Sequence, residues 1–242
     1  MELIFLEETD STNTYLKEMC KSGAAHGTVV YTANQLSGYG RYGKYWHSEK
    51  DKNLAVSVLL RSPSTCSLPP MSIVSGVAVH NVIFKITDTR IKWPNDILAG
   101  FRKLCGISCE CIFVENEAHI ILGIGVNVNN TNFPGDLSQT ATSLKMETEQ
   151  DRDVNVLMHE ILESVFEYYE MALNGGFPKI LKEFSSNCIN LGREVTAFKR
   201  DEQIQGVAVD IDEEGCLIVK TKSGDYEKFS SGEVSLNYFG RE

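Results

Sequence analysis

The sequence predicts a layered α/β or α+β protein that ends in a small β-barrel. Two observations predict it: strand-like and helix-like segments alternate over most of the chain, and short alternating runs with turn signals follow Phe184. The 242 residues exceed the roughly 100 to 200 that are usual for one domain, so the length allows either one large domain or a large domain plus a small one. The change of pattern places the boundary near Asn190 and predicts domains 1–189 and 190–242.

The N-terminal segment predicts strands, one helix and a glycine-rich loop. The helix has N-cap candidates at Asp10 to Asn13 and runs through Lys21, where Gly23 can close it. Runs of β-branched and apolar residues predict the strands. These strands are Met1–Glu7, Thr28–Ala33 and Asn53–Leu60, and the loop Gly38–Ser48 separates the last two.

The middle of the chain predicts two helices around a group of strands. Met71–Phe84 is apolar enough for a buried helix, and Asp153–Leu173 has apolar residues at i, i+3 and i+4 spacing, typical of a core-facing amphipathic helix. The predicted strands are Arg90–Trp93, then Lys103–Val114 after a turn at Ala99-Gly100, and then Ala118–Val128.

The C-terminal segment predicts the small β-barrel. Its runs are short, and turn signals such as Asp212 to Gly215 and Ser223 to Asp225 separate them. The runs are Glu194–Phe198, Gly206–Asp212, Cys216–Lys220, Tyr226–Phe229 and Val234–Leu236.

Composition excludes several classes of protein. Lys plus Arg at 23 against Asp plus Glu at 33 gives 23 − 33 = −10, which argues against a chain built mainly to bind nucleic acid or an anionic membrane. The N-terminus shows no export signal and no apolar run reaches the roughly 20 residues that span a bilayer, so we expect a cytoplasmic protein without membrane partners.

The cysteines favour neither disulfides nor a zinc site. They number seven and include no C-x-x-C pair. Cys105, Cys109 and Cys111 would share one face of a strand, and their apolar neighbours favour buried thiols over metal binding.

The glycine-rich loop combines the groups that a nucleotide needs. Gly38-Tyr39-Gly40-Arg41-Tyr42-Gly43-Lys44-Tyr45-Trp46 contains two cations and no acidic residue. Glycines let backbone N–H groups approach an anion, Arg offers a bidentate fork to phosphate or carboxylate, and Trp can stack on a base. A mobile surface loop rich in Gly and Tyr has the same appearance, and the loop alone does not decide between the two.

Three further motifs follow along the chain. Lys92-Trp93-Pro94-Asn95-Asp96 places a cation, an aromatic ring, an amide and a carboxylate within five residues at the end of a predicted strand. Lys can meet phosphate and Asp can help to hold Mg²⁺, although a capped turn with a core Trp would also fit. Lys103-Leu104-Cys105-Gly106 adds a second cation, and the segment from Gly123 to Asn129 ends a strand with two amides but lacks the rest of a dinucleotide fingerprint.

Taken in order, these motifs resemble those of the biotin–protein ligases. The resemblance spans nearly the whole chain, includes the terminal Ser231-Gly232-Glu233-Val234-Ser235-Leu236, and is sharpest at Lys92 to Asp96. It implies an α+β fold, with a mixed sheet flanked by helices of the class II aminoacyl-tRNA synthetase-like kind and a C-terminal Src-homology-3-like barrel. It also implies an enzyme that makes biotinyl-5′-AMP from biotin and MgATP and moves the biotinyl group to a lysine of a biotin carboxyl carrier domain.

The resemblance also implies roles for individual residues. Lys103 and Arg41 would be catalytic, and Asp96 would assist the Mg²⁺ ion. The biotin-binding residues would be Ser11, Thr12, Gln35, Gly38, Arg41, Lys103 and Gly106. The nucleotide-binding residues would be Lys44, Trp46, Lys92, Asn95 and Asn127.

The chain departs from the family pattern in its glycine-rich loop. Tyr39 and Tyr42 stand where many members carry Arg, and Lys44 replaces a usual Arg; the two cations differ at a forked phosphate contact. Ser108-Cys109 replaces apolar residues before Glu110. The chain begins directly at the predicted first strand, without the winged helix of family members that bind DNA, so we expect no repressor activity. The sequence leaves the oligomeric state open, and a homodimer is among the states it allows.

Two alternatives stay open. A lipoate ligase or octanoyltransferase shares the fold class, although the Arg-Arg-x-x-Gly-Gly-Gly motif of lipoate ligases is missing from the sequence. A non-catalytic nucleotide-binding or carrier-binding module is the other alternative, and the joint presence of Arg41, Lys103 and Asp96 disfavours it.

Overall fold

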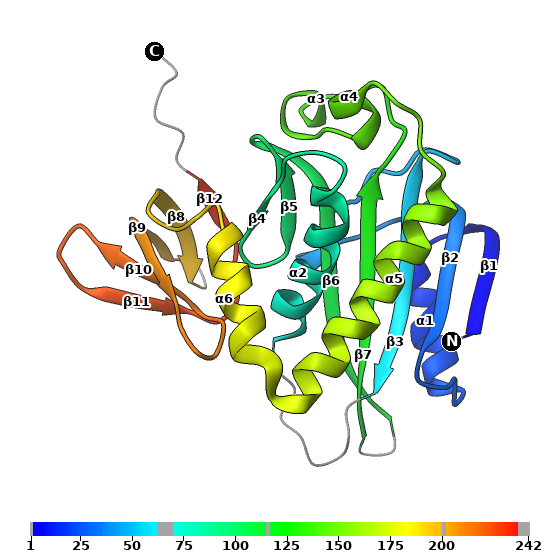
Figure 1. Cartoon of the computed structure of the whole chain (residues 1–242), viewed down its shortest axis with the longest axis horizontal. Coiled ribbons are helices and arrows are strands. Elements are labelled where there is room, and N and C mark those ends of the chain that lie inside the picture. The colour runs from blue at the N-terminus through cyan, green and yellow to red at the C-terminus, as the bar shows by residue number, and fades with distance from the viewer. Residues whose placement is uncertain (1, 62–69, 115–116, 200–201, 237–242) are drawn as a thin grey trace.

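The computed structural model describes residues 2–61, 70–114, 117–199 and 202–236. Its larger part is a seven-stranded mixed sheet in the order β1-β2-β3-β7-β6-β5-β4 (Figure 1). β1 and β2 are parallel, and the other neighbouring pairs are antiparallel. The strands are β1 (Glu2–Thr9), β2 (Thr28–Gln35), β3 (Asn53–Arg61), β4 (Arg90–Lys92), β5 (Asp96–Ala99), β6 (Arg102–Val114) and β7 (Glu117–Asn127). The mixed sheet is therefore confirmed, and the first strand begins at the first described residue.

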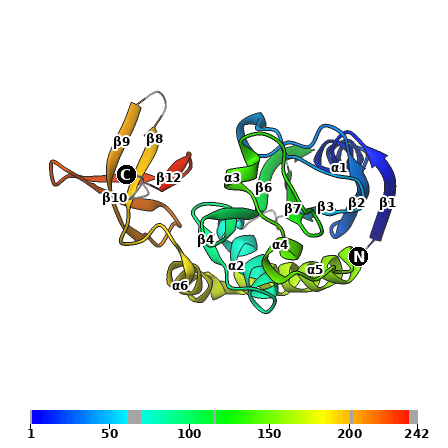
Figure 2. The same cartoon turned by 90° about the horizontal axis from the view of Figure 1, so that it is seen from above.

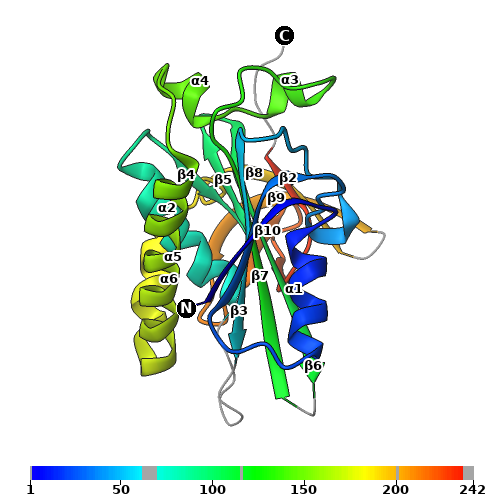
Figure 3. The same ribbon diagram turned by 90° about the vertical axis from the view of Figure 1, so that its right-hand side faces the viewer.

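Helices cover both faces of this sheet. α1 (Thr12–Lys21) lies on one face, while α2 (Met71–Phe84), α5 (Val154–Met171) and α6 (Phe177–Asn187) lie on the other (Figure 3). α2 is apolar almost all round because it is packed between the sheet on one side and α5 and α6 on the other. β3, in the middle of the sheet, is buried from Asn53 to Leu60, which explains its continuous apolar run.

Local sequence signals set the starts of the helices. Ser11 has extended backbone angles, and its Oγ accepts a hydrogen bond from Thr14 N at the start of α1. Asp153 does the same for α5 through the backbone N–H groups of Asn155 and Val156. Two short helices, α3 (Leu137–Thr140) and α4 (Leu144–Thr148), follow β7, and short helical turns occur at Arg41–Gly43 and Ala172–Gly176. Among the described helices, none is long and apolar enough to cross a membrane.

The structure adds two main elements that the sequence analysis did not predict. β5 forms a hairpin with β4 where only a turn was expected, since a four-residue strand is too short to show a period. α6 follows Gly175-Gly176 and carries Pro178 in its first turn, which locally resemble helix breakers. Ile180, Leu181 and Phe184 are buried on one side of α6, so tertiary packing stabilises it.

The C-terminal part is a small antiparallel sheet, in the order β11-β10-β9-β8-β12. It lies to one side of the larger sheet, next to α6 (Figure 2). All five strands lie where short alternating runs were predicted. They are β8 (Glu194–Lys199), β9 (Glu202–Ile211), β10 (Leu217–Thr221), β11 (Tyr226–Phe229) and β12 (Val234–Leu236). Asn190 lies between α6 and β8, and the domain boundary near it stays a prediction.

Trp93 joins the two sheets. The indole is 1% exposed, and its Nε1 donates to Gly215 O in the turn before β10 at 3.0 Å. The backbone N of Trp93 donates to Asn190 Oδ1 at 2.7 Å. The β4–β5 hairpin therefore has one fixed contact with the segment that leads into the C-terminal sheet and one with a turn of the sheet itself.

We expect Asn190→Ala to lower the free energy of unfolding by about 1 to 3 kcal/mol, because it leaves the buried N–H of Trp93 without an acceptor. Urea denaturation followed by Trp fluorescence measures this change. Asn187→Ala is the matched control, since the Asn187 amide donates only to Glu183 O within α6. Equal midpoints for the two variants would contradict a special role for Asn190.

Candidate active site

A cleft forms where the two sheets meet the glycine-rich segment. Its walls come from the start of α1, the end of β2, the β4–β5 hairpin, the adjacent strands β6 and β7, and the loop before β12. Segments that are far apart in the sequence therefore share one cavity. The peptide bond between Trp93 and Pro94 in the hairpin is cis.

The floor of the cleft is polar and nearly closed to solvent. Thr12 N donates to Gln35 Oε1 at 3.0 Å, and Thr12 Oγ1 lies 2.7 Å from Ser57 Oγ. Gly38 lies directly behind Gln35, because a Cβ at position 38 would be 2.4 Å from Gln35 Nε2. These groups form a buried, mutually hydrogen-bonded set of donors and acceptors from α1, β2 and β3.

Trp46 lies against the backbones of β6 and β7. A Cβ on Gly125 would be 2.6 Å from the indole, and one on Gly106 would be 3.0 Å from it. Both positions require glycine, since any larger residue would overlap the ring. The buried Nε1 of Trp46 finds no hydrogen-bond acceptor among the described residues, which leaves a donor for a ligand.

Four cations surround the opening of the cleft. Lys103 Nζ lies 2.7 Å from Asp96 Oδ1, and Lys92 Nζ lies 4.0 Å from Asp96 Oδ2. Arg41 donates to Asn95 Oδ1 at 3.1 Å and to Gly232 O at 3.3 Å. Lys44 forms an ion pair with Glu233, close to β12.

Burial lowers the pKa of Lys92 below its usual value. The nearby Asp96 carboxylate raises this pKa, and the Lys103 ammonium lowers it again. Asp96 thus compensates two ammonium groups at once, and the cluster can accept an additional anion.

Most of the predicted site residues line this cleft. They are Ser11, Thr12, Gln35, Arg41, Lys44, Trp46, Lys92, Asn95, Asp96, Lys103 and Gly106. Gly38 and Asn127 are not among the lining residues. Asn127 is buried, accepts from Asn53 Nδ2 and donates to Thr142 O at 2.9 Å, and its amide also lies 3.4 Å from Lys103 O. Asn127 therefore supports the backbone beside Lys103, and a direct contact with a nucleotide stays a prediction.

The lining residues that were not predicted as site residues include three polar ones, Asn13, Tyr39 and Ser108. Asn13 was interpreted as an N-cap candidate, and Tyr39 and Ser108 were noted only as departures from a family pattern. The signal that could have found Asn13 is its place in Asp10-Ser11-Thr12-Asn13, directly beside two predicted biotin contacts.

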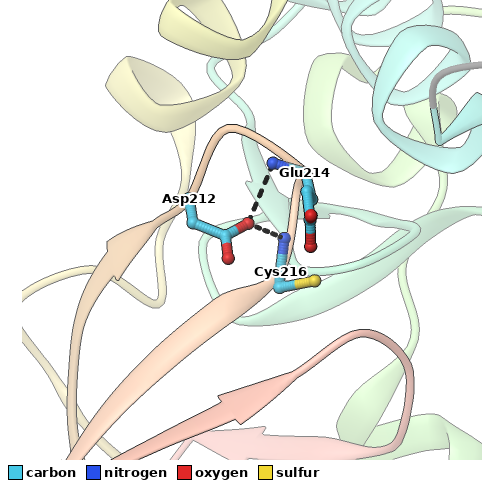
Figure 4. A group of neighbouring side chains, drawn as sticks. All are labelled: Asp212, Glu214 and Cys216. Carbon is cyan, nitrogen blue, oxygen red and sulfur yellow. Dashed lines mark hydrogen bonds between the residues drawn. The ribbon is translucent and has the colours of Figure 1, made fainter.

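A second cluster, of Asp212, Glu214 and Cys216, has the spacing of a metal site but serves a turn. It is the one such group in the described parts of the chain (Figure 4). Asp212 Oδ1 accepts from the backbone N of Glu214 at 3.0 Å and from that of Cys216 at 2.9 Å. Lys228 pairs with both carboxylates, so the charges are already compensated.

Cys105, Cys109 and Cys111, which the sequence analysis considered together, do not form such a group among the described residues. Cys105 is buried and Cys109 is half-buried, and the burial of its thiol raises the pKa of Cys109 to about 12. Cys111 is exposed. Thiols with raised pKa values stay protonated and bind metals poorly.

Comparisons with known proteins place both parts of the chain. The model of the biotin/lipoate A/B protein ligase family matches residues 5–127, and that of the biotin protein ligase C-terminal domain matches residues 191–237. The bifunctional ligase/repressor BirA of Bacillus subtilis is 31% identical over 97% of this chain and 74% of its own length. The biotin–[acetyl-CoA-carboxylase] ligase of Mycobacterium tuberculosis is 26% identical over 96% of this chain and 88% of its own. A solved structure of biotin protein ligase from Aquifex aeolicus with biotin and ATP superimposes with a TM-score of 0.86, at 30% identity and 98% coverage of both chains.

We expect Lys92→Met to unfold at the same or a higher temperature than the parent at pH 7, and Lys103→Met to unfold at a lower one. The first variant removes a charge whose burial is unfavourable, whereas the second removes the closer partner of Asp96. Because the folded pKa of Lys92 lies below its unfolded value, the parent gains stability as pH rises between the two values. The difference in unfolding temperature between Lys92→Met and the parent should therefore become smaller as the pH approaches 10. Thermal unfolding over pH 7 to 10 measures it, and a lower unfolding temperature for Lys92→Met than for Lys103→Met would contradict the argument.

Proposed function

The chain belongs to the biotin/lipoate A/B protein ligase family and carries the C-terminal domain of biotin protein ligases, and we propose from this how it acts. It is an ATP-dependent biotin–[acetyl-CoA-carboxylase] ligase that makes biotinyl-5′-AMP and passes the biotinyl group to a lysine of a carrier domain. One observation supports the residue assignment most, namely that three cations meet at two neighbouring residues above a closed polar floor. Asp96 pairs with Lys92 and Lys103, and Asn95 accepts from Arg41.

The polar floor favours biotin over lipoate. The biotin head carries a urea group with donors and acceptors, whereas the lipoate head is an apolar disulfide ring. Thr12 and Gln35 are buried, and their polar groups offer hydrogen bonds that a urea group can share and an apolar ring cannot use. A site built to hydrogen-bond a substrate discriminates strongly against an analogue that lacks those groups. Ser11, Thr12 and Gln35 are therefore proposed to bind the urea group.

The first chemical step joins two anions. The biotin carboxylate attacks the α-phosphorus of ATP, a new oxygen–phosphorus bond forms, and the bond to the leaving pyrophosphate breaks. The repulsion between carboxylate and triphosphate must be neutralised before they can approach. Arg41 and Lys103 are proposed to hold the carboxylate and the α-phosphate, and Lys92 and Lys44 the remaining phosphates. No covalent enzyme nucleophile is needed.

The residues in the cleft fit a magnesium ion that ATP brings with it. Mg²⁺ binds through one or two carboxylates together with substrate phosphates. Asp96, which lines the cleft between two lysines, offers one such carboxylate and would hold the ion. When bound, the ion would supply further neutralisation of the triphosphate.

Trp46 and Asn95 are proposed to position the nucleotide. The Trp46 indole is fixed by the strand backbones and has an unused N–H donor. Asn95 donates to Ile107 O at 2.7 Å and accepts from Arg41, so it also orients that guanidinium.

In the second step, a carrier lysine attacks the carbonyl carbon of the anhydride. An amide bond forms, AMP leaves, and the attacking amine gives up a proton. The proposal includes no repressor activity, which the excess of ten acidic over basic residues supports, since DNA binding is driven largely by cations. Binding of duplex DNA at low salt would contradict that part.

The function is tested with MgATP and either biotin or lipoate. With MgATP, we expect pyrophosphate exchange and an adenylate of the mass of biotinyl-5′-AMP when biotin is added, and neither when lipoate is added. A biotin carboxyl carrier domain added to the biotin reaction should then become labelled on one lysine. Exchange with lipoate alone would favour a lipoate ligase. Binding of ATP without exchange would favour the non-catalytic module.

We expect Lys103→Gln to slow adenylation about 10²- to 10³-fold, the typical loss for one group that stabilises a developing charge. Gln is one atom shorter than Lys, stays polar and removes the charge. Single-turnover formation of the adenylate measures the rate, and Lys145→Gln, a surface lysine paired with Asp151, is the control. An unchanged rate in Lys103→Gln would exclude the role.

We expect Arg41→Gly to form the adenylate but to release it about ten- to a hundredfold faster, because charge-assisted hydrogen bonds make contributions of that size. Released biotinyl-5′-AMP then labels exposed lysines of unrelated proteins. Stopped-flow fluorescence of Trp46 measures the dissociation rate, and equal rates in parent and variant would show that Arg41 does not retain the intermediate.

A further inference from the structure

Tyr39 connects the glycine-rich segment to α1. Its hydroxyl accepts a hydrogen bond from Lys17 Nζ at 3.0 Å and lies 3.4 Å from Thr14 Oγ1. Its backbone pairs with that of Tyr45, so the same residue also closes the segment on itself. Tyr39 thus fixes the position of Arg41 and its neighbours relative to the helix.

Lys17 is the centre of this connection. Its ammonium forms an ion pair with Glu110 on β6, and the Lys17 side chain is only 22% exposed. Although burial by itself lowers the pKa of Lys17, its hydrogen bonds to Glu110 and Tyr39 raise it above the usual value. The side chain therefore stays charged and keeps both partners at neutral pH.

The connection continues into the floor of the cleft. Asn13 Nδ2 donates to Glu110 Oε1 at 3.1 Å and to Ser108 Oγ at 3.0 Å. Asn13 Oδ1 can only accept, and it receives the Ser57 hydroxyl at 2.6 Å. Ser57 in turn contacts Thr12, which bonds Gln35.

Close packing leaves this chain of bonds little freedom. A Cβ on Gly123 would lie 2.3 Å from Asn13 Oδ1 and 2.6 Å from Ser108 Oγ. Asn13 is 4% exposed and Ser57 is fully buried. A displacement at one end of the chain of bonds therefore disturbs the next member.

We propose that Lys17 and Tyr39 are positioning residues that hold the glycine-rich segment over the biotin site and couple it to the floor that binds the urea group. This inference rests on the proposed function. Three glycines in the segment, Gly38, Gly40 and Gly43, give it many conformations when it is free. The bond from Tyr39 to a charged lysine reduces that freedom before biotin arrives, and preorganisation of this kind increases affinity without a new ligand contact.

The test is Tyr39→Phe, which removes one hydroxyl and keeps the ring. We expect the dissociation constant for biotin, measured by calorimetry without ATP, to rise about tenfold, in line with a hydrogen bond to a charged group. The KM for biotin should rise by the same factor while kcat changes little, because the bond exists with and without substrate. Tyr15→Phe on the outer side of α1 is the matched control and should leave both values unchanged.

A second set of variants addresses the lysine. Lys17→Met should weaken biotin binding at least as much as Tyr39→Phe, because it removes the bond to Tyr39 and also the ion pair with Glu110. The double variant should bind no more weakly than Lys17→Met alone, since that variant has already lost the bond to Tyr39. Lys17→Arg, which can still donate to both partners, should restore most of the affinity. Lys21→Met, which breaks only the exposed Lys21–Glu18 pair on the same helix, controls for charge.

Trypsin cleavage after Arg41 and Lys44 gives a readout that does not depend on catalysis. Biotin should protect the parent, and Tyr39→Phe should need about ten times more biotin for the same protection. The inference would be overturned if a folded Tyr39→Phe kept the biotin affinity and the protection of the parent. It would also be overturned if the losses of affinity in Tyr39→Phe and Lys17→Met simply added in the double variant. Either result leaves the proposed function standing. Failure of the parent to bind biotin would overturn both.

Discussion

The cleft depends on holding four cations together in an acidic protein before any anionic ligand arrives. Ammonium groups at short range repel strongly where little water reaches them. Asp96 lies between Lys92 and Lys103, Glu233 pairs with Lys44, and Asn95 orients Arg41. Burial, together with the Lys103 ammonium, lowers the pKa of Lys92 although Asp96 raises it, so the charge of Lys92 is unfavourable in this place. A triphosphate can therefore replace these internal partners and relieve the remaining repulsion.

That arrangement needs contacts between distant parts of the chain. Lys92 and Asp96 occupy the two strands of one hairpin, and Trp93 within it bonds Gly215 of the C-terminal sheet. The loop before β12 then returns Gly232 and Glu233 to the same cleft. The small sheet thus fixes the hairpin from outside and completes the wall of the site.

The sheet accommodates polar and aromatic side chains through glycines on neighbouring strands. Gly123 gives room to Asn13, and Gly125 and Gly106 give room to Trp46. Each glycine lies where a Cβ would overlap the side chain beside it. The buried floor and the fixed indole are consequences of these close approaches, and they leave the hydrogen-bonded ladder between β6 and β7 continuous.

The sequence by itself determined the long helices and strands, because the 3.6- and 2-residue periods are local, and it determined the cationic motifs, because their order and spacing lie along the chain. It missed β5 and α6, whose local signals are too short or interrupted. It also missed the link from Tyr39 through Lys17 and Glu110 to Asn13, and the contacts by which Asn127 supports the backbone beside Lys103. Those contacts depend on sheet order and register, which bring together residues such as Lys17 and Glu110, 93 positions apart. Only the tertiary structure decides such pairings, because no local preference of either residue selects its partner.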